Sequence, residues 1–180
     1  NYVLMKYVGA EGVAAFTLLG FAVYGYSMIA IGFGQGLTPL VSVCWGAKEQ
    51  KTAMELRGMT NRILFTIGFL FAVFFFMFGK RYAGMFGCGD SVADMVSAGF
   101  RFYTVTFLFM GYDVINSMYF TSCGDALSSA LISSLRGIVL LLGFTFLFSA
   151  LWGITGVWLA APATEVLTTM VSIWLIMKRK

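Results

Sequence analysis

The sequence predicts an all-α integral membrane protein, a polytopic bundle of about five full transmembrane helices plus the end of another. Hydrophobic residues make up 59% of the 180 residues, and charged residues only 11%. A soluble domain of this size does not need so much apolar surface. The few charged residues also gather between long uncharged stretches, as they do at the polar ends of membrane-spanning helices.

The N-terminal part predicts the end of one helix, a turn and then the first complete span. Residues 1–8 are too short to cross a membrane, and we interpret them as the tail of a helix that begins before the sequence does. Lys6, Gly9 and Gly12 predict a short turn after this tail. The first complete span is expected over residues 13–44.

The rest of the chain is organised around the second half of this first span. Residues 12–47 carry no charge, and as one straight helix they would be roughly 54 Å long, against a hydrocarbon core of about 30 Å. Glycine and proline weaken helices, so Gly34, Gly36, Pro39 and Gly46 predict a helix break here. The break has two interpretations: a packing kink at which glycines let helices approach closely, or a flexible joint in a helix that moves.

Charged and turn residues divide the remainder into four further spans. The second span is the clearest, because no charge lies between Arg62 and Lys80, whose long side chains reach the two interfaces. Turns rich in glycine at residues 84–90, 124–125 and 152–156 separate the others. The four predicted spans are residues 63–78, 91–123, 126–150 and 157–177.

The distribution of basic residues predicts an orientation. Because spans alternate in direction, the loops alternate between the two sides of the membrane. One side collects Lys48, Lys51, Arg57 and the basic C-terminus, and the other collects fewer basic residues, namely Lys6, Lys80 and Arg81. Since basic loops stay in the cytoplasm, we expect a multi-pass protein of the cell (inner or plasma) membrane with a cytoplasmic C-terminus.

Composition argues against enzymes and cofactor-dependent chemistry. The sequence has no histidine, and its three cysteines, Cys44, Cys88 and Cys123, lack CxxC spacing. We therefore expect no catalytic residue, no cofactor and no protein-bound metal apart from a coupling ion. The net charge of +4 concerns membrane orientation and does not indicate a nucleic-acid partner. Gly87–Asp90 with Tyr112–Asp113 is similar to the paired motifs of intramembrane aspartyl proteases, but in reversed order and with Asp90 in a loop.

Asp113 is the main candidate for a functional residue. It falls well inside the third span, where a carboxylate costs at least ~2.5 kcal/mol and usually faces a cavity or a partner. With Tyr112 and Asn116 it could hold a hard cation such as Na⁺, or a proton. The alternative is a buried structural pair of Asp113 with Arg136 or Arg101.

Three further polar residues lie within predicted spans. Glu165, in the last span, follows Pro162 by three residues, so it is either a functional acid or a donor to a backbone carbonyl that proline frees. Arg136 is expected to be a structural counter-charge or a ligand of lipid headgroups. Gln35 lies in the predicted break and is included among the candidates for ion or substrate binding.

Several motifs together resemble one transporter family. Gly34-Gln35-Gly36, Pro39 and Gly46-Ala47-Lys48 are similar to the second-helix signature in the C-terminal half of multidrug and toxic compound extrusion (MATE) transporters. Further matches are Gly124 at a turn, Arg136 in the next helix, and the run Gly153-Ile154-Thr155-Gly156-Val157-Trp158-Leu159 followed by Pro162 and Glu165. The resemblance covers nearly the whole chain.

This resemblance implies a twelve-helix exporter built from two lobes of six helices. The chain, residues 1–180, would be the C-terminal transmembrane lobe, with the end of helix 7 and helices 8–12, and the N-terminal lobe would be missing. Such proteins expel small organic cations in exchange for Na⁺ or H⁺. Asp113 matches an acid that some members use for cation coupling, and Tyr112 is close to its aromatic partner. The implied partners are organic cations, membrane lipid and the N-terminal lobe.

Two other functions remain open at this point. A lipid-linked oligosaccharide flippase of the same superfamily would need a more cationic cavity for pyrophosphate. A non-transporting membrane scaffold would use Asp113 and Arg136 only as a structural pair.

Overall fold

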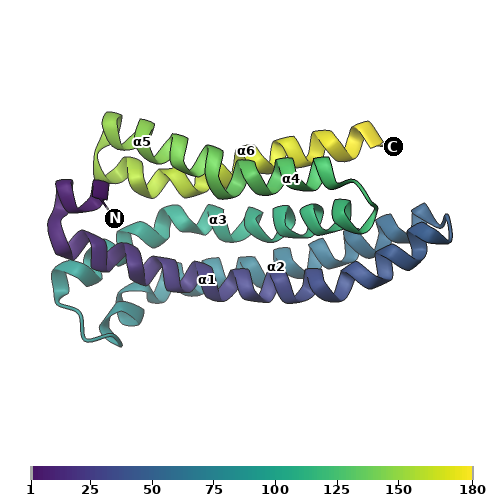
Figure 1. Cartoon of the computed structure of the whole chain (residues 1–180). Coiled ribbons are helices and arrows are strands. Elements are labelled where there is room, and N and C mark those ends of the chain that lie inside the picture. The colour runs from purple at the N-terminus through teal and green to yellow at the C-terminus, as the bar shows by residue number, and fades with distance from the viewer. Residues whose placement is uncertain (1, 180) are drawn as a thin grey trace.

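The computed structural model describes residues 2–179, with side chains described for residues 9–153 and 155–179. Every regular element in this part of the chain is helical (Figure 1). The elements are α1 (Tyr2–Gly46), α2 (Gln50–Gly84), α3 (Asp90–Ser122), α4 (Ala126–Ser134), the π turn η1 (Leu135–Val139), α5 (Leu140–Trp152) and α6 (Ile154–Arg179).

These elements form five long rods, which confirms the predicted all-α bundle. The elements α4, η1 and α5 follow one another without a loop and make up one rod, as predicted for the fourth span. The short connections lie alternately at the two ends of the bundle, so neighbouring rods in the chain run in opposite directions (Figure 1). The predicted turn near Lys6, Gly9 and Gly12 lies at Gly9, where φ is 69° and ψ is −155°.

Four segments are long and apolar enough to cross a membrane: Gly9–Gly46, Gln50–Gly84, Ala126–Gly153 and Thr155–Arg179. The helix α3 does not meet this standard, because it carries Asp94, Arg101 and Asp113. It lies in the middle of the bundle, in contact with α1, α2, α4 and α6 (Figure 1). Its neighbours therefore separate the buried Asp113 from lipid, in the arrangement that membrane proteins use for intramembrane charges.

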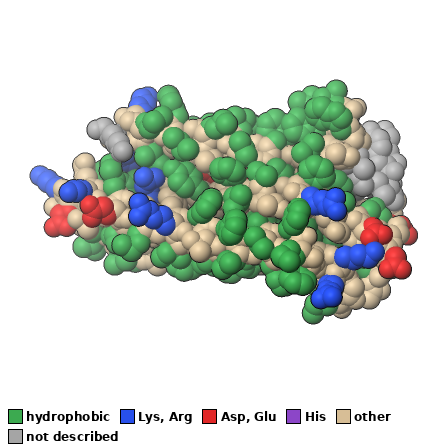
Figure 2. Space-filling model, turned by 180° about the vertical axis from the view of Figure 1, so that it is seen from behind, with side chains coloured by type: hydrophobic (Ala, Val, Ile, Leu, Met, Phe, Trp, Pro, Cys, Tyr) green, Lys and Arg blue, Asp and Glu red, His purple; other side chains and the backbone are tan. Residues whose placement is uncertain are grey.

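The molecular surface also separates apolar from charged side chains. On the face that Figure 2 shows, hydrophobic side chains cover the middle of the molecule and charged side chains gather toward its two ends. At one end, Lys80 and Asp94 form an exposed ion pair of 2.7 Å. At the other end, Arg179 contacts Asp125 at 3.4 Å and lies over the Trp45 ring. Polar groups thus mark both boundaries of an apolar band.

The helix α1 is not interrupted at Gly34, Gly36 or Pro39, so the predicted break does not occur there. The packing interpretation of these glycines holds at Gly34, where a Cβ would overlap Met118 Sδ of α3. Proline removes only one backbone hydrogen bond, the one to the carbonyl of Gln35. Neighbouring Leu37 and Val41 are buried and hold this part of the helix in place. Gly46 is the end of the helix. Since 38 residues extend to about 57 Å, α1 fits its length by projecting beyond the hydrocarbon core or by tilting.

A dry aromatic core joins α1, α2 and α3. Phe75 stacks on Phe100 with ring centroids 4.6 Å apart, and Phe107 lies edge-on to Tyr26 at 5.8 Å. The Tyr26 hydroxyl donates to the Leu64 carbonyl oxygen at 3.0 Å, so its polar group is satisfied inside this core. Glycines let the three helices approach closely: a Cβ at Gly68 would overlap the Phe107 carbonyl oxygen and the Tyr26 hydroxyl.

Candidate functional site

A stripe of polar side chains on α6 faces the centre of α3. Glu165, Thr169 and Ser172 are spaced four and three residues apart, so they lie on one face of α6, and all three are buried. Opposite them, α3 presents Asp113 and Asn116, which are also buried and share one face. The folding pattern therefore brings the two most polar faces of the bundle together, away from lipid.

The Asp113 carboxylate lies at the middle of this interface with only 1% of the residue exposed. Thr169 Oγ1 donates to its Oδ2 at 2.9 Å. Its Oδ1 is buried and has no hydrogen-bond partner among the described residues. A buried carboxylate oxygen without a donor is costly, so it favours a position for a bound cation, proton or water.

Glu165 is the neighbour of Asp113 and the partner of Arg136. Arg136 Nε donates to both oxygens of Glu165, at 2.9 and 3.1 Å, and Glu165 lies one turn before Thr169, whose hydroxyl contacts Asp113. The structural alternative for Asp113 is thereby revised: Arg136 forms its ion pair with Glu165, and Arg101 is exposed and makes no ion pair with any described residue. Asp113 therefore has no ion-pair partner among the described residues.

The π turn η1 carries Arg136. The Leu140 amide donates to the Leu135 carbonyl oxygen, five residues back, instead of to residue 136. Such turns add one residue to a helical rod and are frequent at functional sites. The extra residue changes which side chains of the rod face α6, and it is here that Arg136 reaches Glu165.

Asn116 lies one turn from Asp113 and connects three helices. Its Oδ1 accepts from Arg57 Nη1 at 2.9 Å and from Asn61 Nδ2 at 3.4 Å, while its Nδ2 donates to Ser172 Oγ at 2.9 Å. Sequence reasoning placed Arg57 at the start of the second span and left out Asn61, Ser172 and Thr169. A periodic pattern could have identified the α2 pair, because both occupy the inward-facing stripe formed by Ala53, Arg57, Asn61, Leu64, Gly68 and Ala72.

Two predicted site residues stand apart from this cluster. Tyr112 is half-buried and makes no hydrogen bond to Asp113 or Asn116 in the described part of the chain. Gln35 is exposed on α1, and its side chain has no hydrogen bond with a described residue. Asp113, Asn116, Glu165 and Arg136 are the sequence candidates that the fold brings together.

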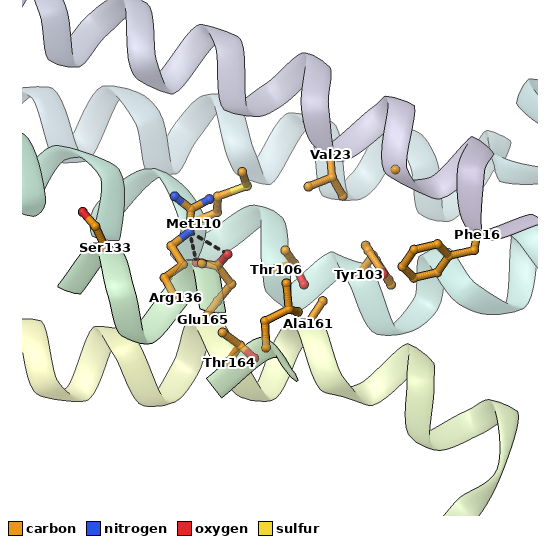
Figure 3. A pocket seen from close by; sticks show the side chains of 13 residues that line it. Phe16, Val23, Tyr103, Thr106, Met110, Ser133, Arg136, Ala161, Thr164 and Glu165 are labelled. Atoms are coloured by element: carbon orange, nitrogen blue, oxygen red, sulfur yellow. Dashed lines mark hydrogen bonds and ion pairs between the residues drawn. The ribbon is translucent and has the colours of Figure 1, made fainter. Parts of the chain in front are cut away.

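Next to the cluster is a cavity of about 460 Å³, hereafter the large cavity (Figure 3). The Arg136–Glu165 pair lies in its wall, and Tyr103, Thr106 and Phe16 lie to one side of the pair (Figure 3). The lining is apolar and aromatic apart from a few hydroxyls and the ion pair. The full lining is Phe16, Gly20, Val23, Tyr103, Thr106, Met110, Ser133, Arg136, Gly137, Leu141, Ala161, Thr164 and Glu165.

The atoms that line this site determine which ligands it could bind. No group of three histidine, cysteine or acidic side chains suited to a metal ion occurs among the described residues. The possible ligand atoms are oxygens, those of the two carboxylates and the Thr169 hydroxyl, because the Asn116 amide oxygen already accepts from Arg57 and Asn61. Oxygen donors suit hard cations and protons, and an apolar cavity beside two acids suits an organic cation.

Solved structures share this fold along nearly the whole chain. A MATE protein crystallised in complex with MaL6 superposes with a TM-score of 0.89 and 20% identity, covering 98% of this chain and 41% of that one. An outward-facing multidrug resistance MATE family transporter of the MOP superfamily gives a TM-score of 0.85 and 20% identity over 98% and 40% of the two chains. A third structure is a MOP superfamily transporter from Pyrococcus furiosus, described as having a binding pocket of reverse polarity that suggests a different function. It superposes with a TM-score of 0.88 and 19% identity, covering 98% of this chain and 40% of that one.

The chain therefore spans about two fifths of the length of the structures that it resembles. No curated protein sequence matches the chain well enough to count as a relative. A model of the protein family described as MatE, in contrast, matches residues 1–147, which is well over half of the sequence. With the multi-pass helical bundle and the structural matches, this assigns the chain to the MatE family of membrane transporters, whose members are not enzymes.

Proposed function

We propose that this chain is the C-terminal lobe of a secondary active antiporter that exports organic cations in exchange for Na⁺ or H⁺. In this proposal it supplies the end of helix 7 and helices 8–12, and a preceding N-terminal lobe supplies the other half of the central cavity. The C-terminus lies in the cytoplasm and the protein in the cell membrane. The basic residues at the end of the bundle that contains α6's C-terminus support this orientation.

The observation that carries the proposal is the pair of buried acids beside the large cavity. Arg136 is paired with Glu165, whereas Asp113 has no ion-pair partner among the described residues, so an ionised Asp113 leaves a buried negative charge unpaired. The electrostatic attraction between a cation and these carboxylates is stronger in this low-dielectric site than it would be in water. Substrate and coupling ion would then compete for the same carboxylates, and binding of one would release the other.

The same charge balance favours organic cations over lipid-linked pyrophosphate substrates. A flippase for such anions needs unpaired cationic groups facing its cavity. In the large cavity described here Arg136 is paired with Glu165, and Asp113 adds a second negative group nearby. A cavity of this kind repels diphosphates.

Replacing the buried acid tests the proposal. In the full-length protein reconstituted into sealed vesicles, we expect Asp113→Asn to lower ion-driven efflux of an organic cation such as ethidium at least about tenfold, because the substituted amide carries no charge to bind the coupling ion. Asp94→Asn is the control, since this acid on the same helix is exposed and paired with Lys80. Efflux that is unchanged in Asp113→Asn contradicts the proposal.

Two further results distinguish the alternatives. If Asp113→Asn lowers the amount of folded protein, Asp113 has a structural role and the scaffold function is favoured. If the full-length protein moves a fluorescent lipid-linked diphosphate between leaflets and no organic cation, the flippase function is correct.

A further inference from the structure

A second, smaller cavity of about 170 Å³ lies on the other side of Arg136. It is hereafter the small cavity, and its lining is Ile31, Asp113, Val114, Ser117, Met118, Ile132, Ser133 and Arg136. Only Arg136 and Ser133 line both cavities. Glu165 belongs to the large cavity and Asp113 to the small one, so each cavity reaches one of the two acids.

The two cavities follow each other along the axis of the bundle. On α1 the large cavity is lined by residues 16–23 and the small cavity by residue 31; on α3 the corresponding residues are 103–110 and 113–118. On the antiparallel rod of α4, η1 and α5 the order is reversed, as it must be, with residues 137–141 in the large cavity and residue 132 in the small one. The large cavity therefore extends toward the end with the α2–α3 and α5–α6 turns, and the small cavity toward the opposite end.

Arg136 occupies the junction between them. Figure 3 shows its side chain beside Glu165 and Met110, with Ser133 on one side and Thr106, Tyr103 and Phe16 on the other. A guanidinium at this point blocks the path sterically, and its positive charge repels a mobile cation. It also occupies the carboxylate that such a cation would use, because Nε contacts both oxygens of Glu165.

Three features of the Arg136–Glu165 ion pair favour its opening. Both hydrogen bonds to Glu165 come from the single Nε, not from the two-nitrogen fork that makes the strongest arginine–carboxylate pairs. The Arg136 side chain is 25% exposed, and a methyl group added at the adjacent Gly137 would meet no other atom within 4 Å. The π turn that carries Arg136 differs from an α-helix by one hydrogen-bond register, and such turns are frequent at functional sites.

We propose that Arg136 is the movable barrier between two half-paths for the coupling cation, and that opening of the Arg136–Glu165 contact connects the large and the small cavity. The inference rests on the proposed function, since it assigns the two acids to one ion path. It makes Arg136 a positioning residue that decides from which side of the membrane each acid is reached.

Thiol accessibility tests this barrier without measuring transport. The full-length protein is prepared with Cys44, Cys88 and Cys123 replaced by serine, and then with one reporter, Val23→Cys in the large cavity or Ser117→Cys in the small one. A membrane-impermeant cationic methanethiosulfonate reagent is added to one face of sealed vesicles. With Arg136 present, we expect Val23→Cys to react from the side of the α2–α3 turn and Ser117→Cys from the opposite side.

Removal of the guanidinium should abolish this sidedness. In Arg136→Gln each reporter is expected to react from its formerly protected side about tenfold faster or more. Arg136→Lys keeps a positive charge and should preserve the sidedness. Arg101→Gln is the matched control, since Arg101 is an exposed arginine on α3 without an ion pair among the described residues, and it should change neither rate.

A folding defect is handled by a second variant. Arg136→Gln leaves Glu165 as an unpaired buried acid, so the double variant Arg136→Gln with Glu165→Gln removes both charges and should fold where the single variant does not. Reaction rates within twofold of the parent in the single variant, or in the double variant if the single one does not fold, overturn the barrier. Because labelling needs no substrate, the two experiments are independent. The labelling result can support the barrier even if the Asp113→Asn efflux result contradicts the proposed function, and the efflux result can support the proposed function even if labelling contradicts the barrier.

Discussion

The two sides of α3 differ sharply. Toward α1 and α2, the helix contributes stacked aromatic rings and glycines that bring backbones into close contact, with the Tyr26 hydroxyl hydrogen-bonded to a carbonyl. Toward η1 and α6, it contributes Asp113 and Asn116 to a polar interface with two cavities. Buried polar atoms without a hydrogen-bond partner among the described residues include Asp113 Oδ1 on this second side, and also Arg57 Nε and Asn61 Oδ1 on α2, whose side chains reach Asn116.

One side of α3 thus contributes close packing, and the other side contributes the candidate functional site. Lipid is as apolar as a phenylalanine ring, so the aromatic side is held together by close packing and not by exclusion from water. On the polar side, the two cavities reduce the packing between helices, and the buried charged groups carry an energetic cost. This is the pattern expected at a functional site. The aromatic side thus supports a site that would be unstable alone.

The largest effect is expected where the aromatic side is packed most closely. Gly68→Ala should lower the free energy of unfolding by about 3 kcal/mol, because the new methyl group overlaps the Phe107 carbonyl oxygen and lies 2.8 Å from the Tyr26 hydroxyl. Gly58→Ala on the same helix meets nothing within 4 Å and should stabilise the protein by about 0.5–1 kcal/mol through helix propensity. Unfolding in detergent monitored by circular dichroism measures both, and equal effects would contradict close packing at Gly68.

An intermediate effect is expected on the polar side. Thr169→Val removes the only hydrogen-bond donor to Asp113 Oδ2 among the described residues and should cost about 2 kcal/mol of stability. Thr164→Val is the control, because this equally buried hydroxyl donates only to the Ala160 carbonyl of its own helix. In an Asp113→Ala background the cost of Thr169→Val should largely disappear. A double-mutant cycle from thermal unfolding tests this, and a coupling energy near zero would exclude the contact.

The smallest effect lies outside both sides, in the loop before α4. The Asp125 side chain accepts from the Ser128 backbone N–H at 3.1 Å and from the Ser128 hydroxyl at 2.9 Å. The backbone N–H of Ser128 is the main cause that lowers the pKa of Asp125, against a partial opposing effect of burial, and Arg179 contributes in the same direction. Asp125→Ala should cost about 1 kcal/mol at neutral pH.

The pH dependence of this cap has a definite sign. A carboxylate with a lowered pKa in the folded protein stabilises it above the ordinary pKa of about 3.9 and loses that contribution as the pH falls through the folded value. Melting temperatures of the parent and of Asp125→Ala should therefore differ at pH 7 and converge in the acid range. Glu49→Ala is the control, since Glu49 precedes α2 without a capping side-chain hydrogen bond. A difference that persists below the folded pKa would contradict the assignment.

Sequence alone predicted the rods and the buried acids. Long uncharged runs between charged ends located the five spans to within a few residues, except that α1 and α2 extend well beyond the apolar part of their spans. The sequence singled out Asp113 and Glu165 as acids within predicted spans, because carboxylates are rare there. The structure places both in one cluster.

The sequence did not predict which side chains the charged residues contact. Arg136 pairs with Glu165, which is 29 residues away along the chain, and no local pattern shows that the rod carrying Arg136 contains a π turn. Arg57 looked like part of an exposed helix start, yet it reaches Asn116 inside the bundle. The break predicted from Gly34, Gly36 and Pro39 failed, because packing on both sides outweighs one lost hydrogen bond.

The π turn has a consequence for how related sequences are aligned. Because η1 contains one residue more than a regular helical turn would need, a relative with a regular α-helix here has one residue fewer, and an error of one residue in register corresponds to about 100° around the helix. Relatives without such a turn will need a one-residue gap in the middle of a transmembrane helix, where alignment methods penalise gaps most heavily. Without that gap, the residues on one side of the turn are compared with residues that lie about 100° away around the helix, so that many lipid-facing positions are matched to positions on another face.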